Sequence, residues 1–186
     1  MALHSETGRT GFRYADLALF PEDNLRREII NGELIVTAAP ATRHQSAVVN
    51  IAAALLAYQR AHGGKVFPAP TDVYLSDDNV VEPDVLFVRG DHIDRVENKY
   101  VKGPPDLVVE ISSPSTRRLK LVQKRDLYAQ FGVPEYWYAD LEADRVEVYR
   151  LEEALYGAPT LFDAGQALDT PVLPGFTISV EEALGN

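Results

Sequence analysis

The sequence predicts an α/β chain of the α+β type, with a mixed β-sheet flanked by a few helices. Two segments, 41–62 and 115–131, repeat apolar residues at helical spacing. The run LVVEIS at 107–112 is almost continuously apolar, which is typical of a strand buried on both faces. The expected strands come in runs between the helices, and this order favours a mixed sheet over a strictly alternating doubly wound fold.

The first part of the chain is interpreted as an N-terminal arm over residues 1–20, and 21–186 as one domain. A short helix is expected over 21–27. Asn31-Gly32 separates two apolar runs and predicts a β-hairpin, because both residues tolerate positive φ. The helix over 41–62 is expected to start at an N-cap, Thr42, and to end at Gly63-Gly64.

Further along the chain, the apolar runs predict strands at 65–67, 72–75, 80–88, 107–112, 135–139 and 145–151. Proline lacks a backbone donor, so Glu82-Pro83 interrupts the strand over 80–88. The second helix is expected to end at Gly132-Val133-Pro134, and a final helical turn is expected over 180–184.

Composition excludes several classes of protein. The chain has 186 residues, 46% of them apolar and none of them cysteine. No run approaches the ~18 apolar residues of a membrane span, and the N-terminus lacks the apolar core of a signal peptide. Disulfides and thiolate metal sites are excluded, so a cytoplasmic protein is expected.

The formal net charge of −10 argues against a protein that coats DNA. One short segment is nevertheless strongly basic and holds no acid. It predicts a nucleic-acid-binding surface, although a solvated helix face would give the same pattern. Its bases are Arg117, Arg118, Lys120, Lys124 and Arg125.

Two carboxylates interrupt apolar runs. Glu110 lies inside LVVEIS, and Asp84 follows Pro83 at the start of VLFV. A buried carboxylate needs a cation or loses its charge, so the pair predicts a site for Mg²⁺ or Mn²⁺, which prefer oxygen ligands. The alternatives are a structural salt bridge for Glu110 and a simple Pro-Asp turn for Asp84.

Lys124 supplies the third element of the predicted site. On a wheel of about 100° per residue, it falls within the apolar stripe of Leu121, Tyr128 and Phe131. A lysine there must either extend to solvent or meet a carboxylate. Lys120 lies on the flank of the same stripe and is the alternative candidate.

His44 and Glu33 are further candidates for catalytic residues. His44 lies in the first turn of its helix, on the same face as Ile51 and Tyr58, where it could bind metal, contact phosphate or act as a base. Glu33 directly follows the hairpin turn. A structural histidine and an ordinary strand residue are the alternatives.

Four segments together resemble a known family. EPDVLFV (82–88), PPDLVVEISSPSTRR (104–118), KRDLYAQFGVPEYWYAD (124–140) and REIINGELIVTAAPATRHQ (27–45) resemble a bacterial restriction-endonuclease family, once classed as a domain of unknown function, within the PD-(D/E)XK nuclease superfamily. The resemblance covers roughly residues 15–180 and implies a restriction-endonuclease-like sheet with the acidic site at one end.

The resemblance also implies roles for individual residues. Asp84 matches the Asp of the PD element, and Glu110 matches the second acid. The superfamily's lysine usually lies two residues later, where this chain has Ser112; in this family it is moved to the following helix, at Lys124. Glu33 and His44 match acidic and histidine positions of the N-terminal hairpin and helix.

One position departs from the family pattern, because Lys120 stands where the family commonly has Asp.

The expected function is a Mg²⁺-dependent DNA endonuclease, with a homodimer supplying the second active site that duplex cleavage needs. The alternative, which Lys120 and the acidic C-terminal region favour, is an inactive relative that binds nucleic acid or a partner protein. A structural oligomer joined through Tyr136-Trp137-Tyr138 is a third possibility.

Overall fold

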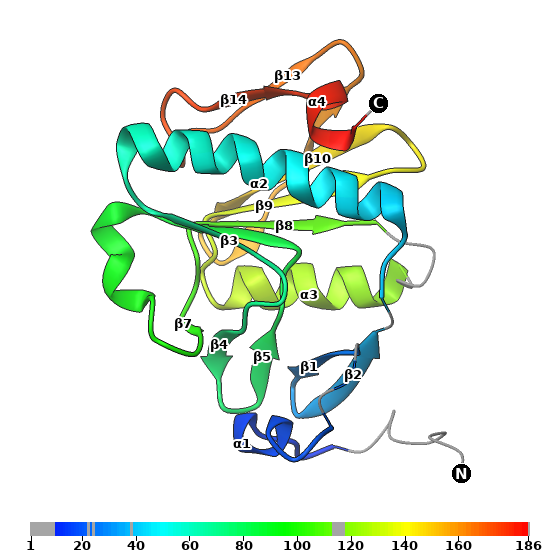
Figure 1. The fold of residues 1–186 in the computed structure, drawn as a ribbon, viewed down its shortest axis with the longest axis vertical. Coiled ribbons are helices and arrows are strands. Elements are labelled where there is room, and N and C mark those ends of the chain that lie inside the picture. The colour runs from blue at the N-terminus through cyan, green and yellow to red at the C-terminus, as the bar shows by residue number, and fades with distance from the viewer. Residues whose placement is uncertain (1–9, 22, 24, 38, 113–117, 186) are drawn as a thin grey trace.

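The computed structural model describes residues 10–21, 23, 25–37, 39–112 and 118–185. Within these ranges it is a mixed α and β structure in which helices cover both faces of a central sheet (Figure 1). The helices are α1 (Tyr14–Leu17), α2 (Thr42–His62), the 3-10 helix η1 (Gly90–Arg95), α3 (Arg118–Gln130) and α4 (Val180–Leu184).

The described strands form three sheets. The central one has the order β11-β10-β9-β8-β6-β3, with β12 also paired to β10. Its strands are β3 (Lys65–Pro68), β6 (Val85–Val88), β8 (Leu107–Ile111), β9 (Glu135–Asp140), β10 (Arg145–Glu152), β11 (Leu155–Tyr156) and β12 (Thr160–Asp163). Only β8 and β9 run parallel among these pairs, so the sheet is mixed as predicted.

A second sheet, of order β2-β1-β5-β4-β7, contains the N-terminal hairpin. Its strands are β1 (Arg26–Ile30), β2 (Glu33–Thr37), β4 (Val73–Ser76), β5 (Asn79–Val81) and β7 (Val101–Lys102). Strands β13 (Ala167–Asp169) and β14 (Thr177–Ser179) pair separately. The run over 80–88 therefore divides between two sheets at Glu82-Pro83, where proline cannot donate to a ladder.

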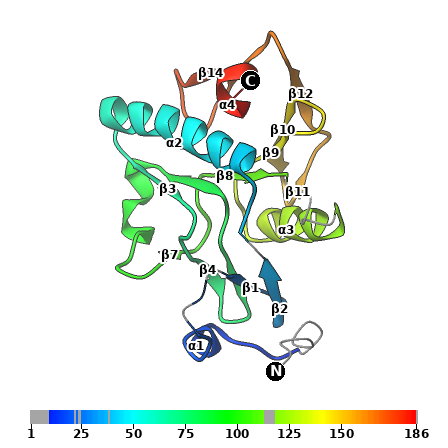
Figure 2. The ribbon, with the colours of Figure 1, turned by 45° about the vertical axis from the view of Figure 1, so that its right-hand side comes forward.

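Alternate residues of the central strands face two different layers. Val85, Phe87 and Val109 pack with Ile51 and Leu55 of α2. The intervening residues, Leu86, Val88 and Val108, pack with Leu127 and Tyr128 of α3 and with apolar side chains of the second sheet. The views in Figures 1 and 2 show α2 and α3 on opposite faces of the central sheet.

Two local expectations were wrong. The expected helix over 21–27 is replaced at its end by β1, because Arg26 already pairs with Thr37 of the hairpin. The N-cap of α2 is Ala41, without a side-chain cap, and Thr42 is already helical. Gly63 ends α2 with positive φ, as the Gly63-Gly64 pair predicted.

The aromatic strand β9 lies largely in the interior. Tyr136 and Trp137 are each 1% exposed, and Trp137 Nε1 donates to Glu135 Oε1 at 2.6 Å. These rings pack inside the chain, so they are not free to form an oligomer surface. No helix in the described part of the chain has the length and apolar character that crossing a membrane requires.

Candidate active site

Asp84 and Glu110 lie next to each other at the ends of two inner strands of the central sheet. Asp84 directly precedes β6, and Glu110 is the fourth residue of β8. The two strands are antiparallel, and the register that pairs Val85 with Val109 places Asp84 across from Glu110. Both carboxylates are buried, with 2% and 4% of their surface exposed. The pairing of β6 with β8 thus brings together two residues that are 26 positions apart in the sequence.

Both oxygens of Asp84 accept hydrogen bonds. Oδ2 accepts from the backbone N–H of Ile111 at 2.8 Å and from His44 Nε2 at 3.1 Å. Oδ1 accepts from the Arg26 guanidinium at 2.8 Å. Burial would raise the pKa of Asp84, but the hydrogen bond from His44 and the charge of Arg26 outweigh burial and lower it to about 2. Asp84 is therefore charged at neutral pH.

Glu110 has a different environment. Its Oε1 lies 2.5 Å from Lys124 Nζ and accepts a hydrogen bond from the Tyr128 hydroxyl at 2.7 Å. Burial raises the pKa of Glu110, Lys124 lowers it, and the charges of Asp84 and Glu28 raise it again, to about 7. Adjacent carboxylates with opposite pKa shifts are common at catalytic sites.

Lys124 is buried on α3 and faces the sheet, where the helical wheel placed it. Its Nζ contacts Glu110 Oε1 and donates to Glu28 Oε1 at 2.7 Å. Burial would lower the pKa of Lys124, but the charges of Glu110 and Glu28 raise it above its usual value. The ammonium is therefore a fixed positive charge between two carboxylates.

The hairpin contributes Glu28 to this cluster, and Glu33 lies elsewhere. Glu33 is exposed and pairs with Ile30 beside the turn, whereas Glu28 is 4% exposed and also accepts from the Glu82 backbone N–H at 2.8 Å. The expectation for Glu33 is therefore corrected. Glu28 directly precedes the apolar pair Ile29-Ile30, but it follows Arg26 and Arg27, so its neighbours do not mark it as buried in the way that those of Glu110 do.

His44 approaches the cluster from the first turn of α2. It is 5% exposed, and its Nε2 contacts Asp84 Oδ2. Its Nδ1 is buried and has no hydrogen-bond partner among the described residues. His44 therefore holds Asp84 with one nitrogen and keeps the other free for a further polar group.

The structure only partly describes the basic segment. Arg117 lies outside the described residues, and for Arg118 and Lys120 only their backbone in the first turn of α3 is described. Arg125 is partly exposed, lies over the Tyr149 ring at 5.5 Å and donates to Asp126. Among the residues predicted to contact nucleic acid, Arg125 is the one whose side chain the structure describes, and it lies partly exposed beside an aromatic ring.

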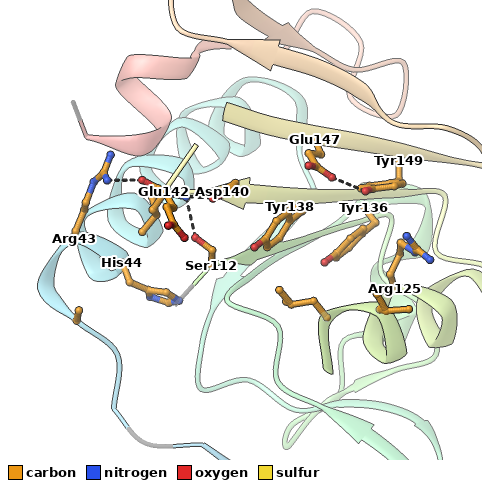
Figure 3. Close-up of a pocket in the computed structure, with 14 residues that line it drawn as sticks. Arg43, His44, Ser112, Arg125, Tyr136, Tyr138, Asp140, Glu142, Glu147 and Tyr149 are labelled. Atoms are coloured by element: carbon orange, nitrogen blue, oxygen red, sulfur yellow. Dashed lines mark hydrogen bonds between the residues drawn. The ribbon is translucent and has the colours of Figure 1, made fainter. Parts of the chain in front are cut away.

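A groove of about 880 Å³ adjoins the cluster at His44. Figure 3 shows Tyr136, Tyr138 and Tyr149 along it, with Arg43 and His44 at one end and Arg125 near the other. A groove of this size, which reaches from a buried carboxylate–histidine pair to solvent, can admit a substrate. The remaining described lining includes Ser112, Asp140, Glu142 and Glu147.

Comparison with known proteins places the chain in a family. The family model Uma2, described as "Putative restriction endonuclease", matches residues 13–181. The chain belongs to the Uma2 family. No curated protein matches it.

The fold of this Uma2 protein is also found in a solved structure. A crystal structure from Anabaena variabilis, described as a "putative nuclease", superposes with a TM-score of 0.79 at 19% sequence identity. The match covers 94% of this chain and 98% of the other. The restriction-endonuclease-like fold predicted from the sequence is confirmed.

Restriction-endonuclease-like proteins generally use divalent metals, and the side chains of this Uma2 site offer what such an ion requires. The donors are hard oxygens, and four carboxylates pair with two cationic side chains of the described part of the chain, Arg26 and Lys124. The four are Glu28, Glu82, Asp84 and Glu110. The excess negative charge and the oxygen donors fit Mg²⁺ or Mn²⁺.

The present arrangement is not that of a formed metal centre. Among the described residues, no group of three or more histidine or carboxylate side chains is arranged to hold an ion. Arg26 and Lys124 lie against the carboxylate oxygens instead. An ion bound by these carboxylates would therefore have to displace a cationic side chain.

Glu82 makes the stability of this Uma2 protein depend on pH. Burial and the charges of Glu28 and Asp72 raise the pKa of Glu82 to about 7, although Arg26 and Lys124 lower it. This folded-state pKa exceeds the unfolded value of about 4.3. The contribution of Glu82 to the free energy of unfolding is therefore greatest below about pH 4.3 and is lost as pH rises through 7. We expect Glu82→Gln to raise the free energy of unfolding at pH 8 by on the order of 1–3 kcal/mol.

The measurement is urea unfolding at pH 5 and pH 8 in metal-free buffer, followed by fluorescence of the single tryptophan, Trp137. Glu82→Gln should gain stability over the wild type at pH 8 and little at pH 5. Glu97→Gln is the control, because that side chain is 43% exposed. An equal gain at both pH values would contradict the assigned pKa.

Proposed function

We propose that this protein is a Mg²⁺- or Mn²⁺-dependent DNA endonuclease. The observation that carries the proposal is a pair of adjacent carboxylates at the ends of two central strands, one of them in contact with a buried lysine, beside an open groove. Asp84 and Glu110 lie across from each other, and Lys124 Nζ is 2.5 Å from Glu110. Together with membership of the Uma2 family, this arrangement favours phosphodiester hydrolysis over other hydrolytic chemistry.

Asp84 and Glu110 would hold the ion, and the backbone carbonyl of Ile111, the residue after Glu110, would help. When bound, the metal supplies a water of lowered pKa and positive charge near the phosphate. Side chains of the protein supply the remaining contributions to the reaction. His44 orients the carboxylate of Asp84 through Oδ2, and Lys124 provides a fixed ammonium that can hold the attacking water or neutralise charge on the phosphate.

Substrate contacts outside the reacting phosphate would come from the basic segment. Arg117, Arg118, Lys120 and Arg125 are proposed to contact the DNA backbone, which would give a salt-dependent affinity. The net charge of −10 limits such contacts to this local surface. A homodimer would supply a second active site for the other strand of a duplex, and a reducing cytoplasm suits a chain without cysteines.

The test is cleavage of supercoiled plasmid DNA in Mg²⁺ or Mn²⁺ and in EDTA. We expect nicked and linear products with either metal, no products in EDTA, and a rate that falls as salt increases. Folded protein that leaves the plasmid intact at millimolar Mg²⁺ and Mn²⁺ would argue against the proposal.

A second candidate is a protein that binds nucleic acid or a protein partner without cutting. The observation that favours it is that the charges of Asp84 and Glu110 are already neutralised by side chains of the protein, since Arg26 lies against Asp84 and Lys124 against Glu110. This candidate predicts no metal binding at millimolar concentration by the intact fold. A metal titration therefore discriminates between the two.

A further inference from the structure

Arg26 is the one lysine or arginine among the described residues that pairs with an oxygen of Asp84. Its guanidinium donates to Asp84 Oδ1 at 2.8 Å and to the carbonyl of Glu82 at 3.2 Å, and its Nε lies 3.8 Å from Glu82 Oε2. The other oxygen, Oδ2, is held by His44 and by the backbone N–H of Ile111. Oδ1 is therefore the oxygen that an ion can take without breaking the contacts that orient the carboxylate.

The two cations of the cluster differ in how they are enclosed. The Arg26 side chain is 21% exposed, whereas the Lys124 side chain is 6% exposed. Arg26 also comes from β1 of the second sheet, whereas Asp84 precedes a strand of the central sheet. Arg26 thus lies at the rim of the cluster and can turn toward solvent, while Lys124 is confined between Glu28 and Glu110.

We propose that Arg26 is an internal counter-ion that occupies Asp84 Oδ1 until a divalent cation displaces it, and that Arg26 thereby sets the metal concentration at which the site fills. This inference rests on the proposed metal-dependent function. Arg26 is a positioning residue in it, because it acts on the metal through Asp84.

The size of the effect of Arg26 on metal affinity follows from competition between its guanidinium and the ion for Asp84 Oδ1. When a binding site is available only a fraction of the time, the observed dissociation constant is the intrinsic one divided by that fraction. A guanidinium–carboxylate pair that is open about one tenth of the time would weaken metal binding about tenfold. The positive charge of a guanidinium that remains nearby would weaken binding further by repelling the ion.

The test measures metal binding and needs no cleavage. Purified protein is titrated with Mn²⁺, and free Mn²⁺ is measured by electron paramagnetic resonance in the wild type, Arg26→Met and Arg26→Gln. The matched control is Arg27→Met, because Arg27 is the next residue of β1 and pairs with Asp23 at 2.7 Å, outside the cluster. Circular dichroism confirms that each variant is folded, and Arg26→Gln retains a polar side chain in case methionine prevents folding.

We expect Arg26→Met and Arg26→Gln to lower the Mn²⁺ dissociation constant about tenfold and Arg27→Met to leave it unchanged. Binding by the Arg26 variants alone, with none by the wild type, would also support the proposal. Equal or weaker binding by folded Arg26 variants, beside a wild type that binds, would overturn the role of Arg26 and leave the metal-dependent function standing. No binding by any folded variant or by the wild type would overturn both.

Discussion

Asp84→Asn is expected to lower the rate of metal-dependent DNA cleavage by about 10²–10³-fold or more, the range found when one group that stabilises a transition state is removed. The substitution keeps the size of the side chain and removes its charge. The pKa of Asp84 is about 2, so its carboxylate is charged at neutral pH. An uncharged amide cannot replace that charge. The measurement is the initial rate of plasmid nicking in Mg²⁺ at pH 8, together with the unfolding midpoint.

Asp106→Asn is the matched control for this substitution. Asp106 is 1% exposed and directly precedes β8, as Asp84 precedes β6, but its oxygens accept from the Arg89 backbone N–H at 2.8 Å and from His92 Nδ1 at 2.7 Å. It therefore lies at the opposite end of β8 from Glu110. We expect Asp106→Asn to reduce stability and to leave the cleavage rate per folded molecule unchanged. Equal rates for Asp84→Asn and the wild type would remove Asp84 from the proposed site.

Lys124→Met is expected to be the most destabilising single substitution in the cluster, by about 3–5 kcal/mol. The methionine fills similar space, but it leaves Glu28 and Glu110 buried without their shared ammonium. The loss should be smaller at pH 5 than at pH 8, because the unpaired carboxyls can then bind protons and lose their charge. Urea unfolding at the two pH values, followed by Trp137 fluorescence, measures both effects.

The control for Lys124→Met is Lys102→Met, because Lys102 Nζ lies 3.9 Å from Glu97 and its side chain is 63% exposed. Exposed ion pairs contribute little, so we expect a change of about 0.5 kcal/mol or less. Similar losses for the two variants, or a loss at position 124 that does not depend on pH, would contradict the buried ion pairs described for Lys124.

The parts of the site that could be predicted are the charged residues that stand within apolar stretches of the sequence. Glu110 and Asp84 interrupt apolar runs, and Lys124 interrupts the apolar stripe of a helix. Each is a charge at a position that its neighbours mark as buried, and the structure buries all three. The same reasoning predicted α2, β8 and α3, since strong periodicity needs no knowledge of tertiary contacts.

Arg26, Glu28 and the actual position of Glu33 could not be predicted in this way. Arg26 meets a residue 58 positions away, and Glu28 meets one 96 positions away. Glu33 pairs with Ile30 and so shares the hairpin face of Glu28, but it lies beside the turn. Which of the two acids meets Lys124 depends on how the hairpin packs against α3, which is a contact between distant segments. The division of the strands among separate sheets likewise depends on pairings between distant segments.

The hairpin origin of Arg26 and Glu28 has a consequence for how the protein is made. The carboxylates and their cations come from a hairpin near residue 30, a strand start at 84, a strand end at 110 and a helix at 124. Contacts that span such distances form only after the entropy of closing long loops has been overcome. A ribosome-bound chain that has not yet released α3 would hold the acids without their lysine. The cluster of carboxylates and cations can therefore assemble only after α3 has left the ribosome.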